Sequence, residues 1–166
     1  MSLRNRTMFC MQVTVSHSET NKKGYSHEVK EQYVVEAASF IDAEQRIHDE
    51  MNYNNRPIMV KAISRPKFEE ICFSDDISDS WYKAKTQTTE YTDSGKEKKV
   101  SHYFLVQAPD NQSAINAVND VIYKDSIEDY EIADIVKTRI LDVLENDKHL
   151  ATLANKDANG GEEKLS

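Results

Sequence analysis

Cysteine is scarce in this chain of 166 residues, which contains only Cys10 and Cys72. A small disulfide-stabilised domain would be much richer in cysteine. Neither residue belongs to a C-x-x-C pair, so structural zinc and thioredoxin-like chemistry have no support. We therefore interpret both cysteines as buried thiols that pack as small hydrophobic side chains in a reducing compartment.

Glycine and proline are also few, with four and three residues. This excludes collagen-like and low-complexity classes. With so few glycines a phosphate-binding loop is difficult to place, and none of the glycine-rich or H-E-x-x-H motifs occurs. No apolar run approaches the roughly 20 residues of a membrane span, and the start of the chain lacks the apolar region of a signal peptide. The sequence thus predicts a cytoplasmic protein without membrane association.

Basic residues are outnumbered, with 21 Lys and Arg against 29 Asp and Glu and a net charge of −8. A general nucleic-acid-binding protein usually carries a basic surface, so this balance argues against that class. The charge is uneven, however. Residues 56–73 and 81–108 each have two more basic than acidic residues, whereas acid concentrates in 39–51, 74–79 and 125–131.

The chain contains an internal similarity. Residues 33–37 (YVVEA) match residues 104–108 (FLVQA) 71 positions later, and the same offset pairs Ile47 with Val118. Upstream, Met8-Phe9 aligns with Trp81-Tyr82 if the two hairpins differ in length by two residues. Because such similarity is typical of repeated architectures, we predict two copies of one structural unit.

Each half begins with a predicted β-hairpin. Residues 8–15 and 81–88 alternate in the period-2 pattern of half-buried strands, and in the first strand Phe9 shares a face with Met11, Val13 and Val15. Glycine-containing turns follow at 21–24 and 92–95, where a positive φ is needed. The return strands are expected to end at Ala37 and Ala108.

A helix is predicted next in each half. Ser39 and Asp110 are residue types that cap helix N-termini. Single apolar stripes follow, one made of Phe40, Ala43, Ile47 and Met51 and the other of Ala114, Val118 and Ile122. Such stripes indicate helices that cover one face of a sheet.

Further strands are predicted at 58–64 and 130–138, with a fourth piece in each half that extends or pairs with them, at 67–73 and 139–144. The predicted fold is therefore α+β, with two tandem β-β-α-β(-β) repeats, antiparallel sheet and helices on one face. The expected boundaries are a first repeat 1–73, an acidic linker 74–80, a second repeat 81–144 and a largely mobile tail 145–166. The two repeats are expected to share one core.

The sequence predicts no catalytic, cofactor-binding or metal-binding residue. His48-Asp49-Glu50 contains the H-x-E fragment of zinc deaminases but lacks the accompanying P-C-x-x-C. The three aspartates of residues 74–79 lack the turn glycine and terminal glutamate of a calcium loop. A solvated linker is the better interpretation of that segment.

One surface could bind nucleic acid. Trp81, Lys83 and Lys85 alternate onto one face of their strand, and both hairpin tips are basic, through Lys22, Lys23, Lys96, Lys98 and Lys99. A basic face with aromatic side chains is a platform on which single strands stack. The alternative is that Trp81 fills the core while the lysines protect strand edges.

Several of these segments resemble a family of small domains of unknown function found in gut anaerobes, their mobile elements and phages. The resemblance rests on residues 6–13, the strand 33–37 with the helix start that follows it, Phe73-Ser74-Asp75, Trp81-Tyr82-Lys83 and residues 105–108, and covers about residues 6–144. It departs at Met8, where an aromatic residue is expected. The resemblance implies a cytosolic setting on a phage or mobile element and transfers no functional residues.

Three functions remain as hypotheses. The leading one is a non-catalytic binding or accessory protein that acts on a protein partner, with acidic helices and exposed strand edges as interfaces; self-association as a homodimer is included. The second is a single-stranded nucleic-acid-binding protein that uses Trp81, Lys83, Lys85 and the hairpin tips. The third is an enzyme without a recognisable motif.

Overall fold

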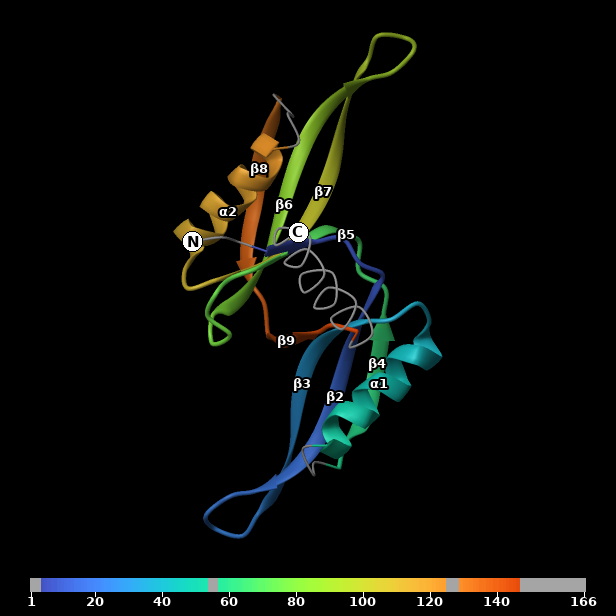
Figure 1. Cartoon of the computed structure of the whole chain (residues 1–166), viewed down its shortest axis with the longest axis vertical. Helices are drawn as coiled ribbons and strands as arrows, with labels where there is room; N and C mark the ends of the chain where they lie inside the picture. The colour runs from blue at the N-terminus through green and yellow to red at the C-terminus, as the bar shows by residue number, and fades with distance from the viewer. Residues whose placement is uncertain (1–3, 54–56, 125–128, 147–166) are drawn as a thin grey trace, which may run out of the picture. The chain divides into compact units, whose positions relative to one another are not determined.

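The computed structural model describes residues 4–53, 57–124 and 129–146 (Figure 1). This part of the chain is α+β, with two helices and nine strands in two sheets, as predicted. It divides into two compact units. Unit 1 contains residues 4–8 and 65–142, and unit 2 contains residues 9–64 and 143–146. Neither unit is one continuous segment, so the units do not follow the predicted boundaries at 73 and 81.

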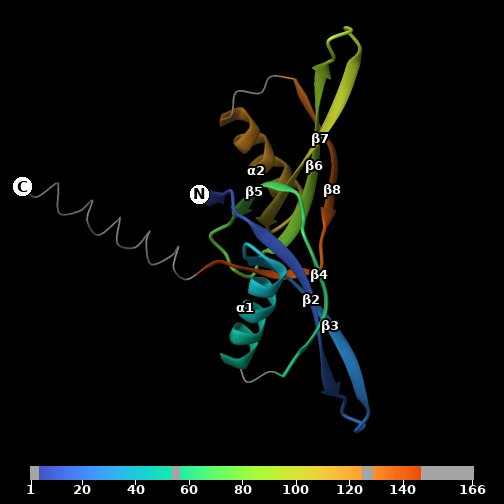
Figure 2. The ribbon, with the colours of Figure 1, turned by 90° about the vertical axis from the view of Figure 1, so that its right-hand side faces the viewer.

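Unit 2 has a four-stranded sheet in the order β4-β2-β3-β9. Its long hairpin pairs β2 (Cys10–Thr20) with β3 (Ser26–Glu36), and β4 (Met59–Ser64) runs antiparallel to β2. The fourth strand of this sheet, β9 (Ile140–Leu144), comes from the far end of the chain, and only its last two residues fall within unit 2. Helix α1 (Phe40–Tyr53) packs on one face of this sheet (Figure 2).

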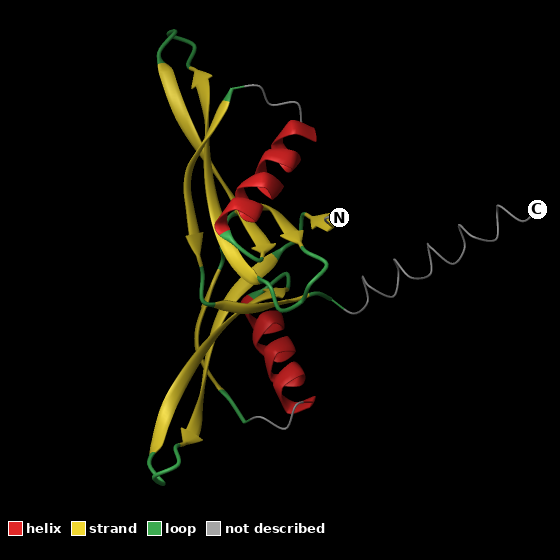
Figure 3. Cartoon of the chain, turned by 90° about the vertical axis from the view of Figure 1, so that its left-hand side faces the viewer, coloured by secondary structure: helices red, strands yellow, loops and turns green. Residues whose placement is uncertain are grey.

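Unit 1 has a five-stranded sheet in the order β1-β5-β7-β6-β8. Its hairpin pairs β6 (Ser80–Tyr91) with β7 (Glu97–Ala108), and β8 (Tyr130–Lys137) runs antiparallel to β6. The short β1 (Arg4–Arg6) borders β5 (Phe68–Phe73). Helix α2 (Asn111–Lys124) covers one face of this sheet (Figure 3).

The predicted fourth strands exist, but each belongs to the sheet of the other half of the chain. β5 follows β4 in sequence and pairs with β7, and β9 follows β8 and lies beside β3. The β5–β7 pair is parallel, which corrects the prediction of purely antiparallel sheet. Alternation identifies a strand but not its neighbour. The outer edge of β7 accepts β5 because β6 occupies its other edge.

The two hairpins have the same length, so the predicted difference of two residues is wrong. Cys10 pairs with Glu36 and Trp81 with Gln107, which keeps the offset of 71 through both strands. Cys10, not Met8, is therefore the position that corresponds to Trp81. Phe9 lies before β2 and is 82% exposed, so it does not share the buried face of Met11.

Glycine makes both hairpin turns possible. Gly24 has a φ of 86° and Gly95 a φ of 80°, values that residues with a β-carbon rarely adopt. Their amides donate to the carbonyls of Asn21 at 3.0 Å and Thr92 at 2.8 Å. The two predicted turns are thus confirmed with the same geometry.

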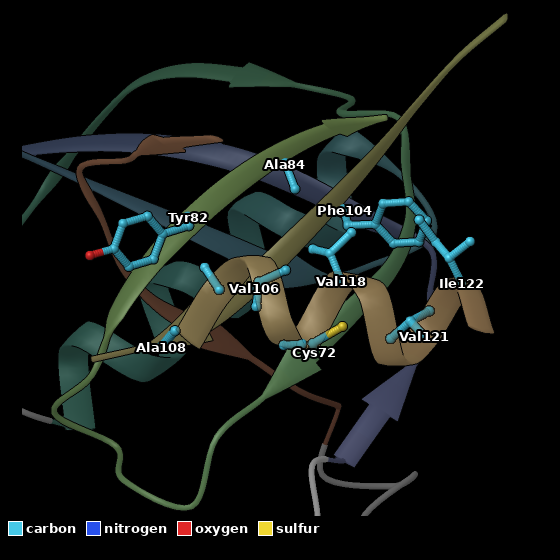
Figure 4. Packing of buried hydrophobic residues seen from close by; sticks show 11 residues of the cluster. Cys72, Tyr82, Ala84, Phe104, Val106, Ala108, Val118, Val121 and Ile122 are labelled. Carbon is cyan, nitrogen blue, oxygen red and sulfur yellow. The ribbon is translucent and has the colours of Figure 1, made fainter. Parts of the chain in front are cut away.

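Each unit has its own core between helix and sheet. In unit 1 the stripe of α2, with Val118 and Ile122, packs on Tyr82, Phe104 and Val106 (Figure 4). In unit 2, Ala43, Ile47 and Met51 of α1 pack on the hairpin. The predicted stripes are confirmed except at Phe40, which is half exposed.

Candidate functional site

Trp81, Lys83 and Lys85 share the face of β6 that points away from α2, because Tyr82, Ala84 and Thr86 are buried on the other face. The alternation is as predicted, and of the two interpretations of Trp81 the one that buries it in the core is confirmed, whereas the exposed stacking surface is not. Its side chain is only 2% exposed, and its ring meets the Phe73 ring edge-on, with centroids 5.5 Å apart and planes at 88°. Trp81 therefore offers no surface on which a base could stack.

Lys83 and Lys85 lie next to an aromatic residue that the sequence analysis missed. The Lys83 Nζ is 4.9 Å from the centre of the Tyr103 ring, and Lys85 is directly opposite Tyr103 in the strand register. This spacing permits a cation–π contact. The signal was available in the sequence, since Tyr103 is 18 residues after Lys85 across a hairpin whose turn was identified correctly.

The lysines of the hairpin tips are matched by acidic residues. Residues 89–99 hold Lys96, Lys98 and Lys99 together with three acidic residues, and the Lys99 Nζ lies 3.2 Å from Glu131 Oε1. Lys22 and Lys23 belong to the other unit, in a tip that also carries Glu19 and Glu28. Neither tip therefore has a net positive charge.

The predicted acidic linker is a folded turn. The Ser74 Oγ donates to Asp79 Oδ2 at 2.8 Å, and Asp76 Oδ1 accepts hydrogen bonds from the Ser78 amide at 2.9 Å and the Ser78 hydroxyl at 2.6 Å. These bonds to Ser78 hold the pKa of Asp76 below its ordinary value, the hydroxyl contributing most. Asp76 consequently stays charged at neutral pH.

Gln107 attaches this turn to β7. Its side chain is buried, with 5% exposed. Its Oε1 accepts a hydrogen bond from the Ser74 amide at 3.2 Å, and its Nε2 donates to the Ile77 carbonyl at 3.4 Å. The amide group of one buried side chain thus satisfies backbone groups at the start and in the middle of the turn.

A hollow of about 630 Å³ separates this turn from α2. Its apolar lining comes from Ile77, Ala108, Pro109 and Ala117, and its charged lining from Asp75, Asp76, Asp79 and Asp120. We call this hollow the aspartate groove. No ion pair between described residues involves any of these four aspartates. Ile77 stands at its rim with 93% of its side chain exposed.

Comparison with known proteins identifies the family of this chain but no activity. The model of a domain of unknown function, DUF4494, matches residues 10–146. The chain belongs to the DUF4494 family. Neither a curated protein nor a solved structure matches it. In the described part of this DUF4494 domain, no helix is long and apolar enough to cross a membrane.

The cysteines of this DUF4494 domain are both buried. Burial, with a smaller effect of the Glu36 carboxylate, raises the pKa of Cys10 from 9.0 to about 11. The thiolate is the nucleophilic form, so Cys10 is almost entirely an unreactive thiol at neutral pH. This agrees with the interpretation of Cys10 as a packing residue.

Two histidine networks were missed by the sequence analysis. In unit 1, His102 Nδ1 lies 3.0 Å from Glu69 Oε1 and His102 Nε2 lies 3.2 Å from Thr88 Oγ1. In unit 2, His17 Nε2 lies 2.9 Å from Glu31 Oε1. Both networks link neighbouring strands on the helix-facing side of a sheet, beyond the end of the apolar core. The partners of each histidine come from other strands, so no local sequence motif predicts these networks.

Proposed function

We propose that this DUF4494 domain is a non-catalytic binding protein that acts on a protein partner, and that a basic segment of the partner docks in the aspartate groove. The observation that carries the proposal is the set of four aspartates around an apolar hollow, with no cation of the described chain paired to them. A cationic segment would relieve their mutual repulsion and cover exposed Ile77.

The fixed conformation of the 74–79 turn favours binding as well. Hydrogen bonds from Ser74, Ser78 and Gln107 already fix the turn in the absence of a partner. A partner that docks against a fixed turn loses less conformational entropy of the receptor on binding. A solvated linker would not provide this advantage.

Strand edges are a weaker candidate for an interface. β4 and β8 are edge strands of their sheets. The register of β4 against β2 shifts between Thr14 and Val15, and the register of β8 against β6 shifts between Lys85 and Thr86, so each edge strand pairs through a bulge. Bulges disturb an edge strand and disfavour its pairing with another chain. Homodimerisation through these edges therefore has less support than the groove.

The nucleic-acid hypothesis has less support than the protein-binding one. Trp81 is buried, and the lysines of both hairpin tips are balanced by acid. Lys83, Lys85 and Tyr103 remain as its best surface. The enzyme hypothesis gains no support from Cys10, because burial raises the pKa of this thiol to about 11 and keeps it protonated. A phage or mobile-element setting rests on the sequence resemblance alone and stays a prediction.

The two units also support the proposed duplication. The caps of the two helices, Ser39 and Asp110, keep the offset of 71, as do Gly24 and Gly95 in the turns. We infer that a β-β-α-β-β segment was duplicated and that each copy then placed its last strand in the sheet of the other.

The test of the groove uses fluorescence anisotropy with two labelled peptides of equal length, one rich in Lys and Arg and one rich in Asp and Glu. The basic peptide should bind, and adding salt should weaken its binding because the contact is electrostatic. The variant Asp75→Asn/Asp79→Asn should bind it more weakly, whereas Asp93→Asn/Asp134→Asn, on other parts of unit 1, should not. Equal binding of both peptides would refute the groove.

The same assay with labelled single-stranded DNA and RNA tests the alternative. On our proposal neither oligonucleotide binds at low salt, where attraction between charges is strongest. Binding that disappears in Lys83→Glu/Lys85→Glu would instead place the functional surface on the open face of β6 and overturn the protein-binding proposal.

A further inference from the structure

The segments that follow β5 and β9 are attached to their sheets in the same way. In unit 1 the Ser74 amide donates to Gln107 Oε1 at 3.2 Å, and in unit 2 the Asn146 amide donates to Glu36 Oε1 at 3.1 Å. Gln107 and Glu36 occupy equivalent register positions, opposite Trp81 and Cys10. In both units, therefore, the first residues after the strand are anchored to the hairpin at the same register position.

In unit 2 an arginine of α1 contacts this segment. Arg46 of α1 donates from Nη2 to the Glu145 carbonyl at 2.9 Å, one residue before Asn146. The bond is partly buried. Arg46 thus reaches from the helix to the segment that follows β9.

Unit 1 has no such side chain. The helix caps Ser39 and Asp110 are 71 positions apart, and the same offset leads from Arg46 to Ala117. Ala117 lines the aspartate groove and is 3% exposed. At equivalent positions of the two helices, unit 2 thus has a guanidinium group and unit 1 has only a methyl group, which lines the groove.

We propose that the aspartate groove binds the side chain of an arginine from the protein partner, in the position that Arg46 occupies in unit 2. This inference rests on the proposed function and specifies the partner's chemistry. The guanidinium group presents five N–H donors in a planar fork that matches carboxylates, whereas the ammonium group of lysine is a compact point charge. Asp79 and Asp120 supply acceptors on the two sides of the groove.

The apolar lining suits the rest of the side chain. Arginine commonly lays its methylene stem along apolar surface while its charged end remains polar. Ile77 and Pro109 provide such a surface beside the aspartates. A volume of about 630 Å³ leaves room for the residues on either side of the arginine as well.

The test uses three acetylated and amidated pentapeptides, Gly-Gly-X-Gly-Gly, in which X is arginine, lysine or citrulline. Binding is followed by amide chemical shifts of the full-length protein. The arginine peptide should shift residues 74–79 and residues 113–120 of α2, which line the groove. The lysine peptide should bind several-fold more weakly, and the uncharged citrulline peptide should not bind. Loss of one charged acceptor in Asp120→Asn should weaken arginine binding about tenfold.

Two further variants isolate the site. Ala117→Arg places in α2 the arginine that α1 already has, so it should occupy the groove and abolish peptide binding. Asp49→Asn is the matched control, because Asp49 in α1 corresponds to Asp120 in α2 and should leave binding unchanged. If Ala117→Arg does not fold, the comparison of Asp120→Asn with Asp49→Asn still tests the site, because both aspartates are exposed.

The outcomes separate the inference from the proposed function. Equal affinity for arginine and lysine peptides, unaffected by Ala117→Arg, would overturn the arginine site but leave a groove that binds cationic segments. Shifts confined to residues outside 74–79 and α2 would also overturn it. Failure of both cationic peptides, together with failure of the longer basic peptide, would refute the groove itself.

Discussion

Trp81 is a structural residue at the end of β6. Its ring is 2% exposed and packs edge-on against Phe73 at 5.5 Å between centroids. Two residues along the same face, Lys83 is exposed and its Nζ lies over Tyr103. One strand face therefore changes from packed to solvated within a single alternation step, and a substitution should have very different effects at the two positions.

We expect Trp81→Ala to lower the free energy of unfolding by about 3–5 kcal/mol, because it removes a large buried ring and leaves a cavity. Lys83→Ala should change it by less than about 0.5 kcal/mol, the usual range for surface positions. Urea unfolding followed by far-ultraviolet circular dichroism measures both. Similar effects of the two substitutions would contradict the burial of Trp81.

Residue patterns predicted the face on which Trp81 lies but not what covers it. Period-2 alternation along 80–91 depends only on local backbone geometry, so it places Trp81, Lys83 and Lys85 together correctly. Burial of Trp81 depends on Phe73, which comes from a strand on the far side of β7. The groove was missed for a related reason, because it needs the 74–79 turn and α2 to lie side by side.

Helix caps are the elements that the sequence predicted most directly. The Ser39 Oγ accepts a hydrogen bond from the Asp42 amide at 3.1 Å, and Asp110 Oδ1 accepts one from the Ser113 amide at 2.7 Å. Asp42 Oδ2 also accepts a hydrogen bond from the Ala38 amide at 3.3 Å, just before the cap residue. All these partners lie within four residues, so local sequence determines them.

The two caps should respond differently to acid. Hydrogen bonds from the Ser113 amide, and secondarily from its hydroxyl, hold the pKa of Asp110 below its ordinary 3.8. A lowered pKa in the folded state adds stability that is present above pH 3.8 and is lost as the pH falls through the lowered value. Asp110→Asn should therefore be less stable than the wild type at pH 7 and should approach it below pH 3.8.

Ser39→Ala provides the comparison for this cap. Ser39 has no charge to lose, so Ser39→Ala should lower the free energy of unfolding by about 1 kcal/mol both at pH 7 and near pH 3. Urea unfolding at pH 7 and near pH 3 measures all three proteins. A gap between Asp110→Asn and the wild type that is unchanged at low pH would show that the charge of Asp110 does not support α2.

At the scale of the whole molecule, the exchange of β5 and β9 makes the two halves of the chain interdependent. The elements themselves were predictable from alternation, turn glycines and caps. Their assignment to sheets was not, because only residues 65–67 separate β4 from β5 and residues 138–139 separate β8 from β9. Such short links are compatible with pairing in either sheet, and nothing local distinguishes the two.

Deleting β5 tests this interdependence. Ile71, Cys72 and Phe73 of β5 are 1%, 0% and 8% exposed in unit 1, and burial of each large side chain is worth about 1.5–3 kcal/mol. Their combined loss is comparable with the roughly 5–15 kcal/mol that stabilises a typical domain. A fragment of residues 74–166, which begins near the boundary predicted from the sequence, should therefore lack a cooperative unfolding transition.

A fragment of residues 65–166 is only nine residues longer and contains β5 through β8 with α2. We expect it to unfold cooperatively and to show the near-ultraviolet signal of Trp81 against Phe73, which the shorter fragment should not show. Adding a peptide of residues 65–73 to the shorter fragment should restore part of that signal, since the missing strand pairs with β7. Cooperative unfolding of residues 74–166 alone would mean that the second half of the chain completes its sheet without β5, and that the exchange of strands follows from connectivity rather than from the stability of unit 1.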